Sequence, residues 1–145
     1  MSAVGREEIL TLIPHQGRMC LLDAVERWSD AEIACSTNTH RDAANPLCSD
    51  GQLAAVHLAE YGAQAMAIHG GLTNRASGGT PRRGLLVTLR DLKLNVSRID
   101  TVASPLAVRA KKLLVNPDGQ LYSFEIEAAG QVLATGRVGV IHPPE

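Results

Sequence analysis

The stretch GQLAAVHLAEYGAQAMAIHGG, residues Gly51–Gly71, is the longest helical pattern in the chain and decides its fold. It is apolar on nearly every side, and a helix that is apolar all round is buried. Polar residues interrupt it at spacings of i, i+3, i+4 and i+7: His57, Glu60, Tyr61 and Gln64. These spacings place the four side chains in a single stripe. Because an unpaired buried carboxylate is costly, the stripe needs partners or a function.

Composition indicates an ordinary globular protein. The 145 residues predict one domain over 1–145, and the 45% apolar and 20% charged residues suit a soluble protein. The formal net charge is −1, with no basic or acidic block, so we expect no nucleic-acid or membrane partner. The three cysteines form no C-x-x-C pair, which favours reduced thiols. With no signal-peptide core and no membrane span in the sequence, we expect a cytoplasmic protein.

The N-terminal half predicts a short helix, two strands and the start of the long helix. Residues 6–13 can form a short helix that Pro14 ends. Residues 18–28 suit either a helix or a strand, with Met19–Leu22 and Val25 favouring a half-buried strand. Residues 31–40 suit a strand, because apolar and polar residues alternate in them. Ser49 or Asp50 is a candidate N-cap of the long helix, and Gly70-Gly71 a candidate C-cap.

The C-terminal half predicts a loop followed by long strands. Residues 72–83 are rich in Gly, Ser, Thr and Asn and predict a surface loop. Strand patterns then cover 84–96, 105–115, 120–129 and 132–141, with Asn116–Gly119 and Gly130-Gln131 as turns. The last three strands predict an antiparallel meander. One buried helix against one sheet is an α+β architecture, and we expect a hotdog fold, a long central helix wrapped by a curved antiparallel sheet.

Three segments resemble the 3-hydroxyacyl-[acyl-carrier-protein] dehydratases. Ile13-Pro14-His15 with Met19–Asp23 resembles their L-P-H-x-x-P-F-L-L-V-D opening, and Glu60–Ala65 resembles their helical E-A-M-A-Q-A. The small dehydratase-like hotdog proteins of aryl-polyene gene clusters are more similar still. Their D-G-x-L…E-x-M-A-Q pattern matches Asp50-Gly51-Gln52-Leu53 and Glu60–Gln64.

The resemblance implies a hydro-lyase that removes water from a 3-hydroxyacyl thioester and gives the 2-enoyl thioester. The implied partner is an acyl thioester on acyl carrier protein or coenzyme A. The implied assembly is a homodimer or a higher homo-oligomer whose site draws residues from both subunits. One departure stands out. The fatty-acid enzymes carry their catalytic histidine in G-H-F-P-G, fourteen residues before the helix glutamate, and that position here is Pro46.

Dehydration needs a base, an acid and donors for the charge that develops on the thioester oxygen. Glu60 is the first catalytic candidate, with a merely structural carboxylate as the alternative. His15 and His57 compete for the second role. His15 matches a family position that is not the catalytic one, and it is also suited to closing the N-terminal segment onto the sheet. His57 lies one turn before Glu60 on the same face, where it is also suited to a subunit interface.

The remaining candidates are substrate-binding residues. We expect Asp50 and Gly51 at the start of the long helix, where free N–H groups and the helix dipole suit an oxyanion. The alternative for Gly51 is that it only eases a tight entry from the loop into the helix. Gln64 is expected either to orient Glu60 or to bond across a dimer. His57 and Glu60 form an H-x-x-E pair, but no further ligand has diagnostic spacing, so we expect no metal and no cofactor.

Two alternatives to the dehydratase stay open. An acyl thioesterase would use the helix carboxylate to activate water or to attack the thioester, and it would not need the missing histidine. A non-catalytic acyl-thioester-binding subunit would keep the fold without turnover.

Overall fold

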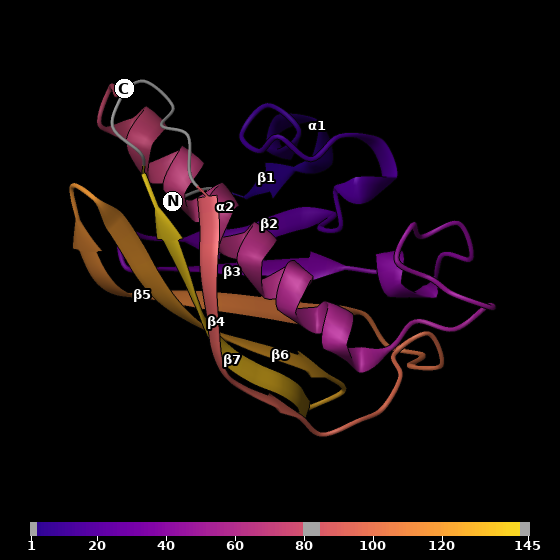
Figure 1. The fold of residues 1–145 in the computed structure, drawn as a ribbon. Helices are drawn as coiled ribbons and strands as arrows, with labels where there is room; N and C mark the ends of the chain where they lie inside the picture. Colours follow the sequence, from indigo (N-terminus) through magenta and orange to yellow (C-terminus); the bar gives the residue numbers. More distant parts are fainter. Residues whose placement is uncertain (1–2, 80–84, 143–145) are drawn as a thin grey trace.

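A computed structural model describes residues 3–79 and 85–142 as one antiparallel sheet and one long helix (Figure 1). The seven strands follow the order β1-β2-β3-β5-β6-β7-β4, and every neighbouring pair is antiparallel. Within the described ranges, no helix combines the length and apolarity needed to cross a bilayer.

The elements have the following bounds along the chain. The helices are α1 (Arg6–Ile9) and α2 (Leu58–Ala76), with 3₁₀ turns at Gly17–Met19, Thr39–Arg41 and Ala55–His57. The strands are β1 (Val4–Gly5), β2 (Ala24–Trp28), β3 (Glu32–Thr37), β4 (Leu85–Leu94), β5 (Leu106–Asn116), β6 (Gly119–Ala128) and β7 (Gln131–Ile141). Strands β5, β6 and β7 form the predicted meander.

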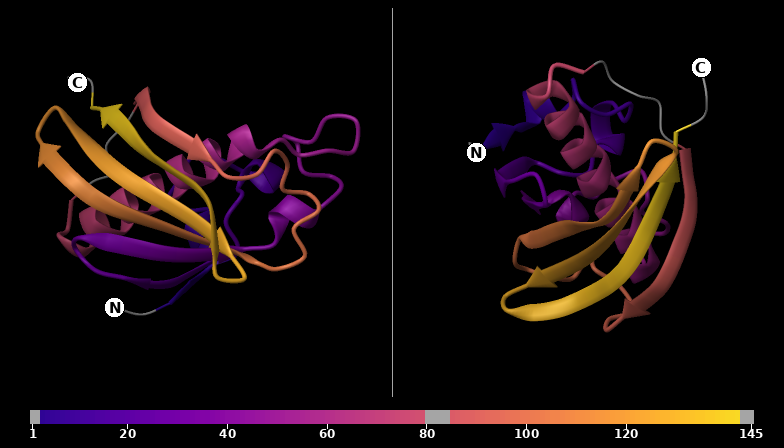
Figure 2. Two further views of the ribbon diagram at one scale, coloured as in Figure 1. Left: turned by 90° about the horizontal axis from the view of Figure 1, so that it is seen from below. Right: turned by 90° about the vertical axis from the view of Figure 1, so that its left-hand side faces the viewer.

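The sheet curves around α2 (Figure 2). One aromatic ring packs between the helix and the sheet. Phe124 of β6 is 3% exposed. A Cβ added to Gly62 of α2 would lie 2.5 Å from the Phe124 ring, and a Cβ added to Gly136 of β7 would lie 2.7 Å from it. Two glycines therefore let helix and sheet close on the ring from both sides. The predicted α+β architecture, a long helix wrapped by a curved antiparallel sheet, is confirmed.

The start of the long helix differs from the prediction. Asp50 and Gly51 have φ of 52° and 73° and form a two-residue turn. The N–H groups of Ser49 and Gln52 each donate to the other residue's carbonyl oxygen, at 2.8 and 3.0 Å. Neither Ser49 nor Asp50 caps the helix, because α2 begins only at Leu58.

The residues between that turn and the helix pair with the segment after β4. The N–H of Ala55 donates to the Ser97 carbonyl at 3.0 Å, and the N–H of Ile99 donates to the Leu53 carbonyl at 2.9 Å. This pairing holds Leu53 and Ala54 extended, and a 3₁₀ turn at Ala55–His57 follows, so the helix begins seven residues later than the predicted start at Gly51. Residues 53–55 are apolar because Leu53 and Ala55 are buried in the hydrophobic core.

The end of the long helix also differs. Gly70 and Gly71 lie inside α2, which runs to Ala76. A Cβ on Gly71 would lie 3.2 Å from Leu12. This glycine therefore allows the N-terminal segment to pack closely against the helix, and it does not end the helix. The loop predicted over 72–83 is therefore helical at first, and its residues 80–83 fall outside the described ranges.

The N-terminal segment is less regular than predicted. The helix expected over 6–13 is only the single turn α1, followed by turns to Pro14. The strand expected over 18–28 is regular only in β2, because its first residues form the 3₁₀ turn at Gly17–Met19 and an extended stretch. This irregular backbone carries His15 to the start of α2.

A buried polar cluster ties the C-terminal part of α2 to the sheet. His69 is fully buried, and its Nδ1 lies 2.5 Å from the Tyr122 hydroxyl. Its Nε2 lies 2.6 Å from the Ser29 carbonyl oxygen, and Trp28 packs edge-on against its ring. Burial lowers the pKa of His69 and raises the pKa of Tyr122. A neutral imidazole that donates from Nε2 to Ser29 and accepts at Nδ1 from Tyr122 satisfies all three groups.

Candidate active site

Glu60 and His15 lie side by side at the start of α2. Glu60 is in the first turn of the helix, and His15 is on the loop that follows α1. The His15 Nε2 lies 3.3 Å from the Glu60 Oε1. Both side chains are about one-third exposed, at 30% and 32%, so the pair is open to a substrate. The structure thus joins a carboxyl and an imidazole, two side-chain types that enzymes use as general acids and bases.

Gln64 orients Glu60 from one turn further along α2. Its amide nitrogen donates to the Glu60 Oε1 at 3.3 Å and to the Met19 carbonyl at 2.8 Å. Its amide oxygen accepts from the Leu21 N–H at 2.9 Å. Gln64 is fully buried, so these contacts hold the amide in one orientation. The side chain links the helix carboxylate to the segment that carries His15.

The loop of His15 is fixed by contacts within the same chain. The Gln16 side-chain amide donates to the Leu10 carbonyl at 2.9 Å. The Arg6 guanidinium donates to the Gly17 carbonyl at 3.0 Å and pairs with Asp23 at 3.2 Å. The buried Nδ1 of His15 has no hydrogen-bond partner among the described residues, so Nε2 is the ring atom that meets Glu60.

His57 lies on the rim of a groove that Glu60 also lines. The groove has a volume of about 340 Å³, and its other walls are Val56, Ala59, Leu89 and Val138. Most of these residues are apolar. No hydrogen bond or ion pair joins His57 to Glu60 in the described part of the chain. His57 is therefore near the Glu60–His15 pair without a hydrogen bond or ion pair to Glu60.

Asp50 and Gly51 lie outside this group of residues. Both are exposed in the turn that precedes the helix. Their expected oxyanion role depended on a helix starting at Gly51. The positive end of the helix instead lies at Ala55–Leu58, beside the groove residues Val56 and His57.

At the position where the fatty-acid enzymes carry their catalytic histidine, this chain has a loop that is bonded to the core. Pro46 lies fourteen residues before Glu60, and its neighbour Asn45 is 4% exposed. The Asn45 amide donates to the Tyr61 hydroxyl at 3.1 Å and to the Thr39 carbonyl at 2.9 Å. The Tyr61 hydroxyl also lies 3.0 Å from the Thr39 Oγ1, and burial raises its pKa. This network closes the loop onto the core.

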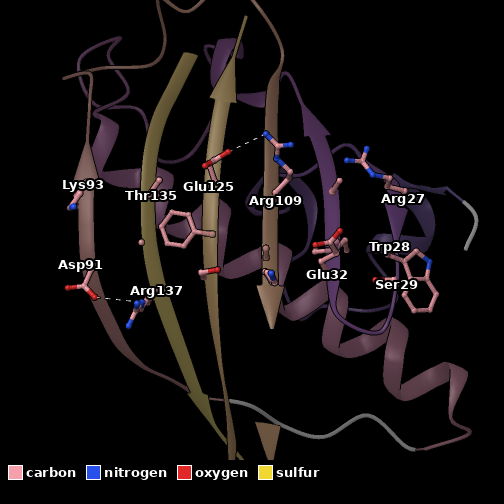
Figure 3. A pocket seen from close by; sticks show the side chains of 17 residues that line it. Arg27, Trp28, Ser29, Glu32, Asp91, Lys93, Arg109, Glu125, Thr135 and Arg137 are labelled. Atoms are coloured by element: carbon pink, nitrogen blue, oxygen red, sulfur yellow. Dashed lines mark hydrogen bonds and ion pairs between the residues drawn. The ribbon is translucent and has the colours of Figure 1, made fainter. Parts of the chain in front are cut away.

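A second hollow, of about 950 Å³, lies on the opposite face of the sheet (Figure 3). Its charged residues form ion pairs across neighbouring strands, with Arg109 to Glu125 at 3.2 Å and Arg137 to Asp91 at 3.8 Å. Strand alternation turns Ser123 and Glu125 outward while Phe124 faces α2. This hollow is larger than the groove at Glu60 but is separated from the acid–base pair by the sheet.

Metal binding has no support among the described residues. No group of three or more His, Cys, Asp or Glu side chains converges there. His57 and Glu60, the H-x-x-E pair of the sequence, gain no third ligand.

Arg6 is the residue of the site that the sequence does not reveal, because nothing in its local pattern signals the distant contact with Gly17.

The fold and the family match define a dehydratase of the hotdog type. Residues 7–145 match the ApeP-like family, described as ApeP dehydratase, and the chain belongs to that family. The resemblance seen in the sequence is confirmed. Among curated protein sequences, none matches the chain.

Solved structures with the same fold include one dehydratase chain. A chain of the dehydratase heterocomplex ApeI:P from Xenorhabdus doucetiae is similar with a TM-score of 0.84 and 26% identity, over 94% of this chain and 91% of that one. AziG from S. sahachiroi is similar in fold, with a TM-score of 0.60 and 16% identity over 83% and 90% of the two chains. A hypothetical thioesterase from Streptococcus pneumoniae TIGR4 is also similar in fold, with a TM-score of 0.60 and 10% identity over 83% and 89%.

Proposed function

We propose that this dehydratase removes water from a 3-hydroxyacyl thioester and gives the 2-enoyl thioester, with Glu60 and His15 as its acid–base pair. The contact of 3.3 Å between the two side chains carries the proposal. The α-hydrogen and the 3-hydroxyl of the substrate are on adjacent carbons, so the groups that reach them must lie close together. His15 and Glu60 meet that requirement.

The reaction needs one member of the pair to be protonated and the other to be deprotonated. The deprotonated member takes the α-proton, the electron pair forms the new C=C bond, and the C–O bond breaks as the protonated member gives its proton to the departing hydroxyl. One water leaves. The base now holds the α-proton and the acid has lost its own proton to the water, so a proton passes from one to the other through the direct contact of His15 with Glu60 before the next cycle.

The surroundings of the pair suit the rest of the substrate. The positive end of α2 at Ala55–Leu58 favours the charge that develops on the thioester oxygen. The apolar groove walls Val56, Leu89 and Val138 suit an acyl chain. Gln64 keeps the Glu60 carboxylate turned toward His15. Acyl carrier protein and coenzyme A are the two carriers to compare as substrates.

We also propose that β4 pairs with a second hotdog subunit. Strand β4 is the last strand of the sheet, and an unpaired edge strand is a liability. Apolar side chains are exposed beside it, with Val56 at 50%, Leu89 at 45% and Leu94 at 38%. A second copy would form a homodimer, whereas a related chain would form a heterocomplex like that named for ApeI:P. The mass of the purified protein, alone and with co-expressed subunits, separates the two.

Substitution of Glu60 tests the proposed reaction. Glu60→Gln removes the ionisable group and keeps its size, so turnover should fall by roughly 10²–10⁴-fold, the usual contribution of such a group. The assay follows the enoyl product and the free thiol separately, with 3-hydroxyacyl and saturated acyl thioesters on each carrier. Free thiol without enoyl product would identify a thioesterase, and binding without either product a non-catalytic subunit. Undiminished dehydration by Glu60→Gln would overturn the mechanism.

A further inference from the structure

We infer that Asp100 is a positioning residue of the proposed reaction, because its carboxylate holds the segment before α2 in the place where the Val56 N–H can donate to the thioester oxygen. This inference rests on the proposed function and adds one residue to it. Asp100 itself touches no reacting atom. It lies 47 residues along the chain from Leu53, the residue whose backbone it binds.

One backbone N–H group of the groove wall is free among the described residues. In the 3₁₀ turn before α2, the N–H groups of Ala55 and His57 donate to backbone carbonyls, at 3.0 and 3.2 Å. The N–H of Val56, between them, makes no hydrogen bond in the described part of the chain. Val56 precedes Glu60 by one helical turn, and both residues line the groove of about 340 Å³. A free donor there suits the negative charge that develops on the thioester oxygen as the α-proton leaves.

Asp100 fixes the backbone three residues before Val56. Its Oδ1 accepts from the Leu53 N–H at 2.9 Å and from the Arg98 Nε at 3.0 Å, and its Oδ2 accepts from a terminal nitrogen of the same guanidinium. The Leu53 carbonyl accepts from the Ile99 N–H at 2.9 Å. Both polar backbone groups of Leu53 are therefore bonded, and the turn that carries Val56 starts from a fixed point.

The environment of Asp100 indicates a fixed hydrogen-bond acceptor. Its side chain is only 16% exposed, although that of its partner Arg98 is 38% exposed. The hydrogen bonds from Arg98 and from the Leu53 N–H hold the pKa of Asp100 well below its usual range, so the carboxylate stays ionised throughout the pH range of an assay. An ion pair near the surface contributes little to stability by itself. The bond to the Leu53 N–H is therefore the contact with a consequence for the groove.

Two substitutions of Asp100 separate this hydrogen bond from the charge. Asp100→Ala removes the acceptor of the Leu53 N–H, so kcat should fall by roughly 10–100-fold, the cost of a misplacement of about 1 Å in an active site. Asp100→Asn keeps an acceptor oxygen without the charge, so its kcat should stay within about threefold of the wild type. KM should change little in both variants, because the thioester oxygen gains its charge only in the transition state. Steady-state kinetics with a 3-hydroxyacyl thioester measure both constants.

A purely structural role for Asp100 predicts other results. Calorimetric titration with a saturated acyl thioester counts the binding sites, which should be as numerous in Asp100→Ala as in the wild type. A loss of sites in proportion to the lost turnover would overturn the inference. If Asp100→Ala does not fold, Asp100→Glu replaces it: the displaced carboxylate should lower kcat more than Asp100→Asn does, and the reverse order would overturn the inference.

Glu125→Ala is the matched control. It also removes a carboxylate that pairs with an arginine, in this case Arg109 at 3.2 Å, but on the opposite face of the sheet from the groove. Its kcat should equal that of the wild type. A loss as large as that of Asp100→Ala would show that any broken ion pair has this effect, and would overturn the inference.

The inference and the proposed function fail in different ways. Absence of enoyl product from the wild type would overturn the proposed function and the inference with it. Suppose instead that the wild type dehydrates its substrate and Glu60→Gln does not. Wild-type kcat in Asp100→Ala, or an Asp100→Asn variant as impaired as Asp100→Ala, would then overturn the inference alone.

Discussion

His15 and His57 differ in what they can do for Glu60, although both lie near it. His15 touches the carboxylate, whereas His57 lines the same groove one helical turn away. We expect His15→Ala to lower kcat by roughly 10²–10⁴-fold, as the loss of a general acid or base does. His57→Ala should change kcat by less than about tenfold. Steady-state kinetics at saturating thioester, with circular dichroism as the folding control, measures both.

Equal and large losses in the two variants would contradict this distinction. So would wild-type rates in both, which would leave Glu60 without a histidine partner and remove the basis of the dehydration mechanism. A rise in KM without a change in kcat for His57→Ala would instead fit its place on the groove wall.

The sequence identified the residues of the site better than their arrangement. Glu60 and Gln64 could be placed on one stripe of one helix, because helical spacing alone decides that. The choice between His15 and His57 could not be made. His57 is a neighbour of Glu60 in sequence, whereas the His15 contact spans 45 residues and depends on distant bonds such as that of Arg6 to Gly17.

At the scale of elements, the contact between α2 and the sheet depends on Gly62. An alanine there would place its Cβ 2.5 Å from the buried Phe124 ring, so the ring or the helix would have to shift. We expect Gly62→Ala to lower the free energy of unfolding by about 1–3 kcal/mol, as overpacking does. Urea denaturation measures the change.

Gly70→Ala is the matched control on the same helix. Its Cβ would meet nothing closer than a Gln120 side-chain oxygen at 3.8 Å, so the better helix propensity of alanine should stabilise the protein by up to about 1 kcal/mol. Adding Phe124→Leu to Gly62→Ala should recover part of the loss. Equal stability of the two alanine variants would contradict the close packing of Gly62 on Phe124.

The existence of α2 could be predicted from its apolar run, but its ends could not. The segment Leu53–Ala55 is as apolar as a buried helix, yet it pairs with residues 97–99, which are distant in sequence. At the other end, Gly70-Gly71 has the composition of a C-cap. Gly71 instead packs closely against Leu12, a tertiary contact that local patterns do not contain.

At the scale of the whole molecule, two buried histidines make stability depend on pH. Burial lowers the pKa of His40 and of His69 below the ordinary value. In the pH window just below about 6.5, the unfolded chain therefore binds protons that the folded chain does not. Stability should be complete above that value and fall as the pH drops, by at most about 1.4 kcal/mol per pH unit for each histidine.

Denaturation at a series of pH values between 5 and 8 measures this dependence. His69→Gln keeps a donor for the Ser29 carbonyl but cannot be protonated, so its stability should depend less steeply on pH than that of the wild type. The slope is the quantity to compare, because the substitution also changes stability at neutral pH. An unchanged slope would show that His69 does not contribute to the dependence.

The Trp28–His69 contact gives the protein an optical reporter of this titration. Trp28 is the single tryptophan of the chain, and the centre of its ring lies 6.4 Å from that of His69. A protonated imidazole quenches excited indole by accepting an electron, whereas a neutral one does so far less. We therefore expect the emission of the unlabelled protein to fall when this buried side chain, at the end of α2 remote from Glu60, becomes protonated.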